Sequence, residues 1–117
     1  MKKLLILLLL LLLTGCQEEG TVTKVNCNEM KKLLADSKTV LVDVRSKEEY
    51  DEGHLENAIN GPLTKLSSLK DDYNLNLKDS IIVYCKSGVR SNDAAKMLLK
   101  LGYKNIYDLG AMSNCLK

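Results

Sequence analysis

The sequence predicts an α/β fold: a small, doubly wound and mostly parallel sheet of five strands, with helices on both faces. Three observations lead to this class. Short apolar or β-branched runs recur along residues 21–109, and segments with helical periodicity separate them. The most apolar of these runs, residues 80–84, suits a strand buried on both faces, which is typical of parallel sheets. The 117 residues leave room for one small domain.

The first 15 residues resemble a bacterial lipoprotein signal peptide. Lys2 and Lys3 precede an apolar run at residues 4–13, which is too short to span a bilayer as a permanent helix. The run ends in Leu-Thr-Gly-Cys, like the lipoprotein cleavage box whose cysteine, here Cys16, is lipidated and becomes the first residue. The alternative is an ordinary signal peptide or an uncleaved anchor with an incidental cysteine. We expect an exported protein, lipid-anchored to the bacterial cell envelope in the periplasm or on the outer face of the membrane.

After this signal, residues 16–20 are expected to form a lipid-anchored tether and residues 21–117 the domain. Residues 1–15 contain two lysines and no acidic residue, so the 17 basic residues fall to 15, which equals the 15 acidic ones. The domain is therefore near neutral. It has no basic block, and tyrosine is its only aromatic residue type, which argues against nucleic-acid binding. We expect a monomer.

The first half of the domain alternates strand and helix patterns. The run at residues 39–44 is apolar except for Asp43, which suits a buried parallel strand. Asn26 or Asn28 can cap the helix before this strand, and Ser46 can cap an acidic helix after it. The expected elements are strands at residues 21–25, 39–44 and 58–59, and helices at residues 26–36 and from residue 46 to the Gly-His pair at 53–54.

The second half repeats the alternation. A weak helix at residues 63–69 and a polar loop lead to the apolar strand at residues 80–84. A tight loop follows, and then a helix at residues 90–101 with small and apolar residues on one face. Gly102 fits the left-handed position that ends this helix. The last strand is expected at residues 106–109, before a short tail.

Cys85 lies where the apolar strand passes into the long helix. In such sheets ligands bind beyond the carboxyl ends of the strands, so a site is expected here. Gly88 permits a curl that turns successive backbone N–H groups inward, and the following helix adds its positive end. These donors favour a thiolate, a persulfide or an oxyanion, and would make Cys85 nucleophilic near neutral pH. Lys86 and Arg90 add positive charge at the rim, and the alternative is a buried structural cysteine.

This loop and its surroundings resemble the rhodanese-like domain family. The resemblance covers residues 22–112, with its pieces in the family's order and spacing. They are Val-Asp-Val-Arg at 42–45, Glu-Tyr at 49–50, Gly-His-Leu at 53–55, Ala-Ile-Asn at 58–60, Pro-Leu at 62–63, the cysteine loop at 82–91, Ala-Ala at 94–95, Leu-Gly-Tyr at 101–103, Asn-Ile-Tyr at 105–107 and Leu-Gly at 109–110. The family's fold is a small doubly wound α/β domain, which agrees with the pattern of elements.

The resemblance implies a two-step sulfur transfer. Cys85 attacks the sulfane sulfur of a small donor such as thiosulfate and becomes a persulfide, and a thiol or cyanide acceptor then removes that sulfur. Cys85 and Arg90 are the implied catalytic residues, with Arg90 binding the donor or stabilising the loop. The implied substrate-binding residues supply backbone amides to the persulfide, and they are Lys86, Ser87, Gly88 and Val89. No cofactor is implied. The six-residue loop is one residue shorter than in related phosphatases and arsenate reductases, which favours sulfur chemistry.

Three further polar residues are candidates near this site. Asp43 and Arg45 end the second strand beside the expected cleft, and we assign them a supporting role, with hydrogen bonds to neighbouring loops as the structural interpretation. His54 is the one histidine, and it belongs to a connecting turn of the family's motif, so it is not assigned to catalysis. Since no second histidine or acidic cluster supplies ligand spacing, no metal site is predicted.

The chain departs from the family's pattern after the last strand. The family has two glycines and then a tryptophan there, whereas this chain has Gly-Ala-Met-Ser-Asn-Cys, with Cys115 near the tryptophan position. This weakens the expected hydrophobic cap and leaves the acceptor open. With Cys16 assigned to lipid, three cysteines remain, so at least one stays outside any disulfide within the chain. Because the first and last strands are neighbours in the family's fold, we hypothesise a Cys27–Cys115 disulfide; alternatively, Cys115 resolves a Cys85 persulfide.

The leading functional prediction is a sulfurtransferase enzyme. The alternative is a persulfide carrier, in which Cys85 accepts sulfur from a partner protein and turns over poorly with small donors. A thiol redox protein is a third candidate, but the chain has no Cys-x-x-Cys pair.

Overall fold

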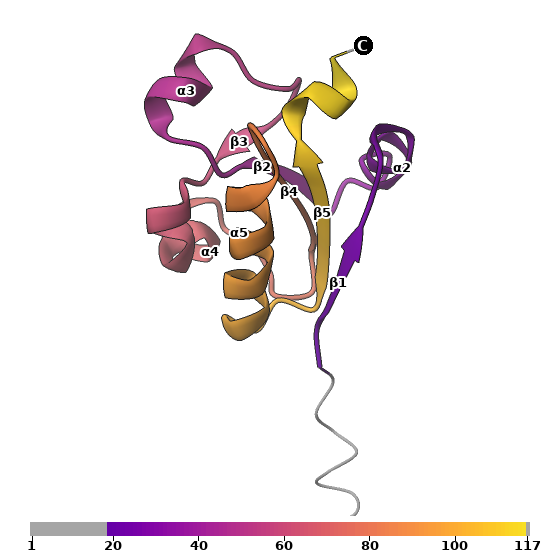
Figure 1. Cartoon of the computed structure of the whole chain (residues 1–117). Helices are drawn as coiled ribbons and strands as arrows, with labels where there is room; N and C mark the ends of the chain where they lie inside the picture. Colours follow the sequence, from indigo (N-terminus) through magenta and orange to yellow (C-terminus); the bar gives the residue numbers. More distant parts are fainter. Residues whose placement is uncertain (1–18, 117) are drawn as a thin grey trace, which may run out of the picture.

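The computed structural model describes residues 19–116, which form a five-stranded sheet with helices on both faces (Figure 1). The predicted signal peptide at residues 1–15 and the lipidation site Cys16 lie outside the described residues. Within residues 19–116, no helix has the length and apolar character needed to cross a bilayer. The α/β class predicted from the sequence is the fold observed.

Every neighbouring pair of strands is parallel, in the order β1-β5-β4-β2-β3. The strands are β1 (Thr21–Lys24), β2 (Thr39–Asp43), β3 (Ile59–Asn60), β4 (Ser80–Cys85) and β5 (Asn105–Ala111). The chain enters at one edge of the sheet, crosses to β2 and β3, and returns through β4 and β5. As a result β4 is central. Because the strands are parallel, the carboxyl ends of β2, β4 and β5 lie side by side at the same end of the sheet.

Short helices connect these strands, and two of them begin with a capping box. The helices are α2 (Cys27–Leu33), α3 (Lys47–Glu52), the 3₁₀ helix η1 (Leu63–Ser68), α4 (Leu69–Asp72), α5 (Val89–Lys100) and the 3₁₀ helix η2 (Met112–Cys115). The Asn26 side chain accepts the Glu29 N–H at 2.8 Å, and the Ser46 hydroxyl accepts the Glu49 N–H at 3.3 Å. These caps fix where α2 and α3 start.

Two hydrophobic clusters lie on opposite faces of the sheet. Figure 1 shows α2 against one face and α5 with α4 against the other. The cluster on the α5 face includes Val42, Val83, Cys85, Ala94 and Leu98. The cluster on the α2 face includes Met30, Leu41, Ile82, Tyr84 and Leu109. Because successive strand residues point to opposite faces, Cys85 faces α5 while Tyr84 faces α2.

Several bounds differ from the sequence-based expectation. The short strand expected at residues 58–59 lies at Ile59–Asn60, and the weak helix divides into η1 and α4. The last strand extends to Ala111, because β4 continues to Cys85 and supplies hydrogen-bond partners beyond the apolar residues, across a register shift at Val83/Tyr84. The expected tail is the 3₁₀ helix η2. Pairing with β4 therefore makes β5 longer than its apolar residues alone would predict.

Candidate active site

Cys85 ends β4 beneath the loop that leads into α5. Its residue is 0 % exposed, and its Sγ accepts the Gly88 N–H at 3.0 Å and the Ser91 N–H at 3.3 Å. Gly88 has φ +99°, a left-handed conformation that glycine adopts without strain and that aims its N–H back at the sulfur. Ser91 lies in the first turn of α5, where backbone N–H groups have no partner within the helix. Two amides and a helix N-terminus therefore stabilise negative charge on this sulfur.

The other predicted loop residues surround the sulfur without holding it through their side chains. Lys86 and Ser87 are exposed, and Val89 is 67 % exposed. Ser91, one residue beyond the predicted set, was missed, although its place in the first turn of the helix was a usable signal. The Ser91 hydroxyl also donates to the Gly88 carbonyl at 3.1 Å, which braces the loop.

Arg90 is paired with an acid that the sequence analysis did not assign to the site. Its Nη1 donates to Glu49 Oε1 at 2.6 Å and its Nη2 to Oε2 at 3.0 Å, a two-point contact between planar groups. The hydrogen bonds from Arg90 lower the pKa of Glu49 to about 2, with a further contribution from Ser46. The same contact raises the pKa of Arg90. In the sequence, Glu49 belongs to the acidic helix after Ser46 and to the Glu-Tyr piece of the family resemblance, and neither indicates a contact with Arg90.

Asp43 and Arg45 form a buried ion pair on the other face of the sheet. Asp43 Oδ1 accepts Arg45 N–H and Nε–H at 2.9 and 3.0 Å, and Arg45 Nη2 donates to Asp43 Oδ2 at 2.7 Å and to the Gly53 carbonyl at 2.6 Å. The Tyr84 hydroxyl donates to Asp43 Oδ2 at 2.8 Å and accepts the Leu55 N–H at 3.0 Å. Burial, and then this bond to Asp43, raise the pKa of Tyr84. The network ties β2 and β4 to the loop after α3, and none of its hydrogen bonds reaches Cys85.

His54 lies apart from the cysteine. It is exposed, and its ring stacks on Tyr50 with 3.8 Å between the ring centroids. Among residues 19–116, no group of three or more His, Cys, Asp or Glu side chains is placed to hold a metal ion.

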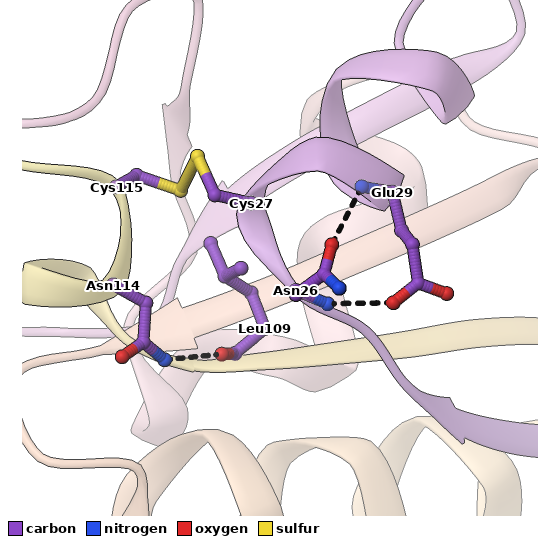
Figure 2. The surroundings of a disulfide bond; sticks show 6 residues. All are labelled: Asn26, Cys27, Glu29, Leu109, Asn114 and Cys115. Carbon is purple, nitrogen blue, oxygen red and sulfur yellow. Dashed lines mark hydrogen bonds between the residues drawn. A yellow bond between two sulfur atoms is a disulfide. The ribbon is translucent and has the colours of Figure 1, made fainter.

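A disulfide joins Cys27 to Cys115, with 5.3 Å between the two Cα atoms. Figure 2 shows this bond beside Asn114, whose Nδ2 donates to the Leu109 carbonyl at 3.2 Å. The hypothesised pairing is therefore present in the structure. Cys115 packs with the cluster on the α2 face and Cys85 with the cluster on the α5 face, so the structure does not bring these two sulfurs together.

A cavity of about 480 Å³ opens beside the cysteine loop. It is lined by Ser87 and Gly88 of the loop, by the end of β5, by Asn114 of η2, and by Lys24 and Val25. The cavity gives a small molecule a place to bind next to the loop that holds Cys85 Sγ.

Comparison with known proteins shows the family to which the chain is related. The model of the rhodanese-like domain matches residues 26–113. A mitochondrial protein of Schizosaccharomyces pombe, provisionally named a thiosulfate sulfurtransferase, is 39% identical over 90 residues, or 68% of this chain and 63% of that protein. The tRNA uridine(34) hydroxylase of Yersinia pestis is 31% identical over 87 residues, or 71% of this chain. The chain thus spans 63% and 24% of the length of these two relatives.

Solved structures show the same fold. The human single-domain sulfurtransferase TSTD1 has a TM-score of 0.71 and 30% identity, covering 83% of this chain and 96% of the human chain. A rhodanese from E. coli solved with anions has a TM-score of 0.60 and 28% identity, covering 65% of this chain and 89% of that chain. With its parallel sheet and its cysteine between β4 and α5, the chain belongs to the rhodanese-like domain family.

Proposed function

We propose that the chain is a sulfurtransferase that moves a sulfane sulfur from a donor such as thiosulfate to a thiol or cyanide acceptor through a Cys85 persulfide. The observation that carries this proposal is the pair of amides, from Gly88 and Ser91, on Cys85 Sγ. Amides fixed in advance stabilise charge without reorganising as it develops. Membership of the family and the names of its sulfurtransferase members support the same reaction.

The chemistry needs only the cysteine and its donors. The Cys85 thiolate attacks the outer sulfur of thiosulfate, the sulfur–sulfur bond of the donor breaks, and sulfite leaves with the electron pair. The new persulfide carries its negative charge on the outer sulfur. An acceptor nucleophile then attacks that sulfur, and the Cys85 thiolate leaves into the same two N–H groups. No oxidant or reductant is consumed, because sulfur passes between nucleophiles at an unchanged total oxidation level.

The burial of Cys85 favours one alternative, a persulfide carrier. At 0 % exposure, the thiolate is reached only after the loop shifts, and a protein partner that opens the loop would load it faster than a small donor. The exposed side chains of Lys86 and Ser87 make no hydrogen bond to another described residue, so a partner protein can contact them.

The test is the formation of thiocyanate from thiosulfate and cyanide, in wild type and in Cys85→Ser. Rapid thiocyanate release that disappears in the variant is the result expected of an enzyme. A chain that carries a persulfide on Cys85 when purified but releases little thiocyanate is a carrier. A Cys85→Ser chain as active as wild type would contradict both functions.

Export and anchoring belong to the same proposal. They rest on the charged start, the apolar run at residues 4–13 and the Leu-Thr-Gly-Cys box that ends at Cys16. Radiolabelled palmitate should enter the full chain in a bacterial host and should be absent from Cys16→Ser. Equal labelling of the two chains would contradict lipidation at Cys16. We also propose that the chain acts as a monomer.

A further inference from the structure

Asp108 is a buried acid that the sulfur-transfer chemistry does not use. It lies in β5, is 4% exposed, and lines the cavity beside the cysteine loop. Its Oδ1 accepts the Gly110 N–H at 2.9 Å. Among the described residues, the polar group that approaches its Oδ2 is the Lys24 ammonium, at 3.7 Å, which is beyond hydrogen-bond length. The side chain of Lys24 is 80% exposed, so water competes for this contact.

The sheet register places this acid close to Cys85. Asp108 pairs with Val83 across β4 and β5, and Cys85 follows Val83 by two residues along β4. Residues two apart on a strand share a face, so Asp108 and Cys85 point to the same side of the sheet. One strand spacing across and two residues along separate the Cα atoms of the two residues by about 8 Å. The cavity that Asp108 lines is therefore bordered on its other side by the loop that holds the cysteine sulfur.

A buried carboxylate on the same side of the sheet as a thiolate or persulfide is unfavourable unless a cation lies beside it. Lys24 supplies this cation only weakly. A carboxylate can accept about four hydrogen bonds, and within residues 19–116 Asp108 accepts one of hydrogen-bond length. Oδ2 accepts no hydrogen bond from residues 19–116, and its lone pairs can accept N–H donors of a primary ammonium group.

We propose that this cavity binds the ammonium group of a small aminothiol, which is the acceptor for the sulfur held on Cys85. The inference rests on the proposed function and names its acceptor class. Asp108 holds the ammonium and so places the thiol of the same molecule over the loop. The aminothiol thiolate attacks the outer sulfur of the persulfide, the bond between that sulfur and Cys85 Sγ breaks, and the Cys85 thiolate is regenerated. The proton of the acceptor thiol passes to solvent, and the acceptor leaves as its own persulfide.

Two bonds fix the η2 residues beside the cavity. Asn114 of η2 lines the cavity, and its side chain donates a hydrogen bond to the Leu109 carbonyl. The neighbouring residue, Cys115, is fixed to α2 by the disulfide (Figure 2). The polar side chains of Lys24, Ser87, Asp108 and Asn114 line the cavity, which suits a charged acceptor.

The test compares two acceptors that share a carbon skeleton and differ in charge, cysteamine and N-acetylcysteamine. The full chain is first loaded with sulfur from thiosulfate, and single-turnover transfer to each thiol is measured at matched thiolate concentrations. We expect cysteamine to react about tenfold faster, the effect of one hydrogen bond to a charged group. Asp108→Asn keeps the acceptor for the Gly110 N–H and should reduce the ratio of the two rates to about one. Lys24→Gln removes the competing ammonium and should increase the ratio.

Equal rates with the two thiols in wild type, or an unchanged ratio in Asp108→Asn, would overturn the inference while leaving the sulfurtransferase intact. A second measurement does not depend on sulfur loading. In Cys85→Ser, ethanolamine supplies the ammonium without a thiol and should shift the Gly110 amide resonance in ¹⁵N NMR spectra, and Asp108→Asn should abolish the shift. A chain that never loads sulfur but shows this shift refutes only the proposed function. A missing shift, or one that persists in Asp108→Asn, overturns the binding site.

Discussion

The guanidinium of Arg90 is held by the carboxylate of Glu49 through two hydrogen bonds of 2.6 and 3.0 Å. The two residues are 41 positions apart in the sequence, so the contact joins the first turn of α5 to α3. Because the hydrogen bonds of the guanidinium go to Glu49, the hydrogen bonds recorded on the Cys85 sulfur come from the amides of Gly88 and Ser91. We propose that Arg90 positions the loop.

The Glu49–Arg90 pair gives the folded state a dependence on acid. The pKa of Glu49 in the folded chain is about 2, below its ordinary 4.5. Since the folded pKa is lowered, the contribution of the pair to stability is complete above pH 4.5 and is lost as the pH falls through about 2. Glu49→Gln, which can still complete the capping box with Ser46, should be less stable than wild type near neutral pH, and the difference should shrink in acid.

Urea unfolding of the two chains between about pH 7 and about pH 2 measures this difference. Glu48→Gln is the matched control, because Glu48 is exposed on the same helix turn and does not contact Arg90. A wild-type advantage that stays constant down to about pH 2 would rule out the pair as its source.

Gly88 is the loop residue at which a substitution should disturb the backbone most. Its φ of +99° costs a residue with a Cβ about 1–2 kcal/mol, and relieving that strain would turn the N–H away from Cys85. We expect Gly88→Ala to slow persulfide formation with thiosulfate about tenfold, the effect of a weakened charge-assisted hydrogen bond. Gly102 has the same φ of +99° at the end of α5, so Gly102→Ala should lose similar stability without slowing the reaction. Equal rates of persulfide formation for Gly88→Ala and wild type would show that the Gly88 amide does not contribute to the reactivity of Cys85.

The buried network around Asp43 should contribute to stability and not to reactivity. Tyr84→Phe removes the donor to Asp43 and the acceptor for the Leu55 N–H, and we expect it to cost about 1–3 kcal/mol in thermal unfolding. Persulfide formation should be unchanged, since Tyr84 and Cys85 face opposite sides of the sheet. Tyr107→Phe is the control, because Tyr107 is half-buried on the same α2 face and its hydroxyl makes no hydrogen bond to another described residue. Similar losses in both variants would contradict the role of the network.

The Cys27–Cys115 disulfide closes a loop with a sequence separation of 88 residues. Closure of a loop this long restricts the unfolded chain and should contribute about 4–5 kcal/mol. Reductant should therefore lower the unfolding temperature of wild type and leave that of the Cys27→Ser/Cys115→Ser chain unchanged. Cys85→Ser should respond to reductant as wild type does. If reductant had no effect on wild type, the disulfide would not contribute to stability in solution.

The fold and the position of the cysteine follow from local patterns. An apolar run, a glycine-containing loop and an amphipathic helix suffice to place Cys85 between a buried strand and α5, and the capping residues Asn26 and Ser46 fix two helix starts. The partners of Arg90 and Asp108 do not follow in this way. Glu49 reads locally as a capping residue, and its contact with Arg90 exists only once α3 folds against α5.

Asp108 shows the same limit within a strand. In sequence it is a single acid in an apolar run, and its significance depends on its register with Val83 and on the shape of the cavity. The end of β5 is likewise set by its partner strand, because Gly110 and Ala111 carry no apolar pattern of their own. Long-range pairing is the information that a single sequence leaves out.

We propose that the amides of Gly88 and Ser91 make Cys85 Sγ the atom that accepts sulfur. Mass spectrometry of the non-reduced chain after incubation with thiosulfate tests it directly. We expect a peptide containing Cys85 that is heavier by one sulfur atom and returns to its original mass after cyanide is added. A Cys85 peptide that stays unmodified while its thiol is free, or a transferable sulfur found on another residue, would contradict it.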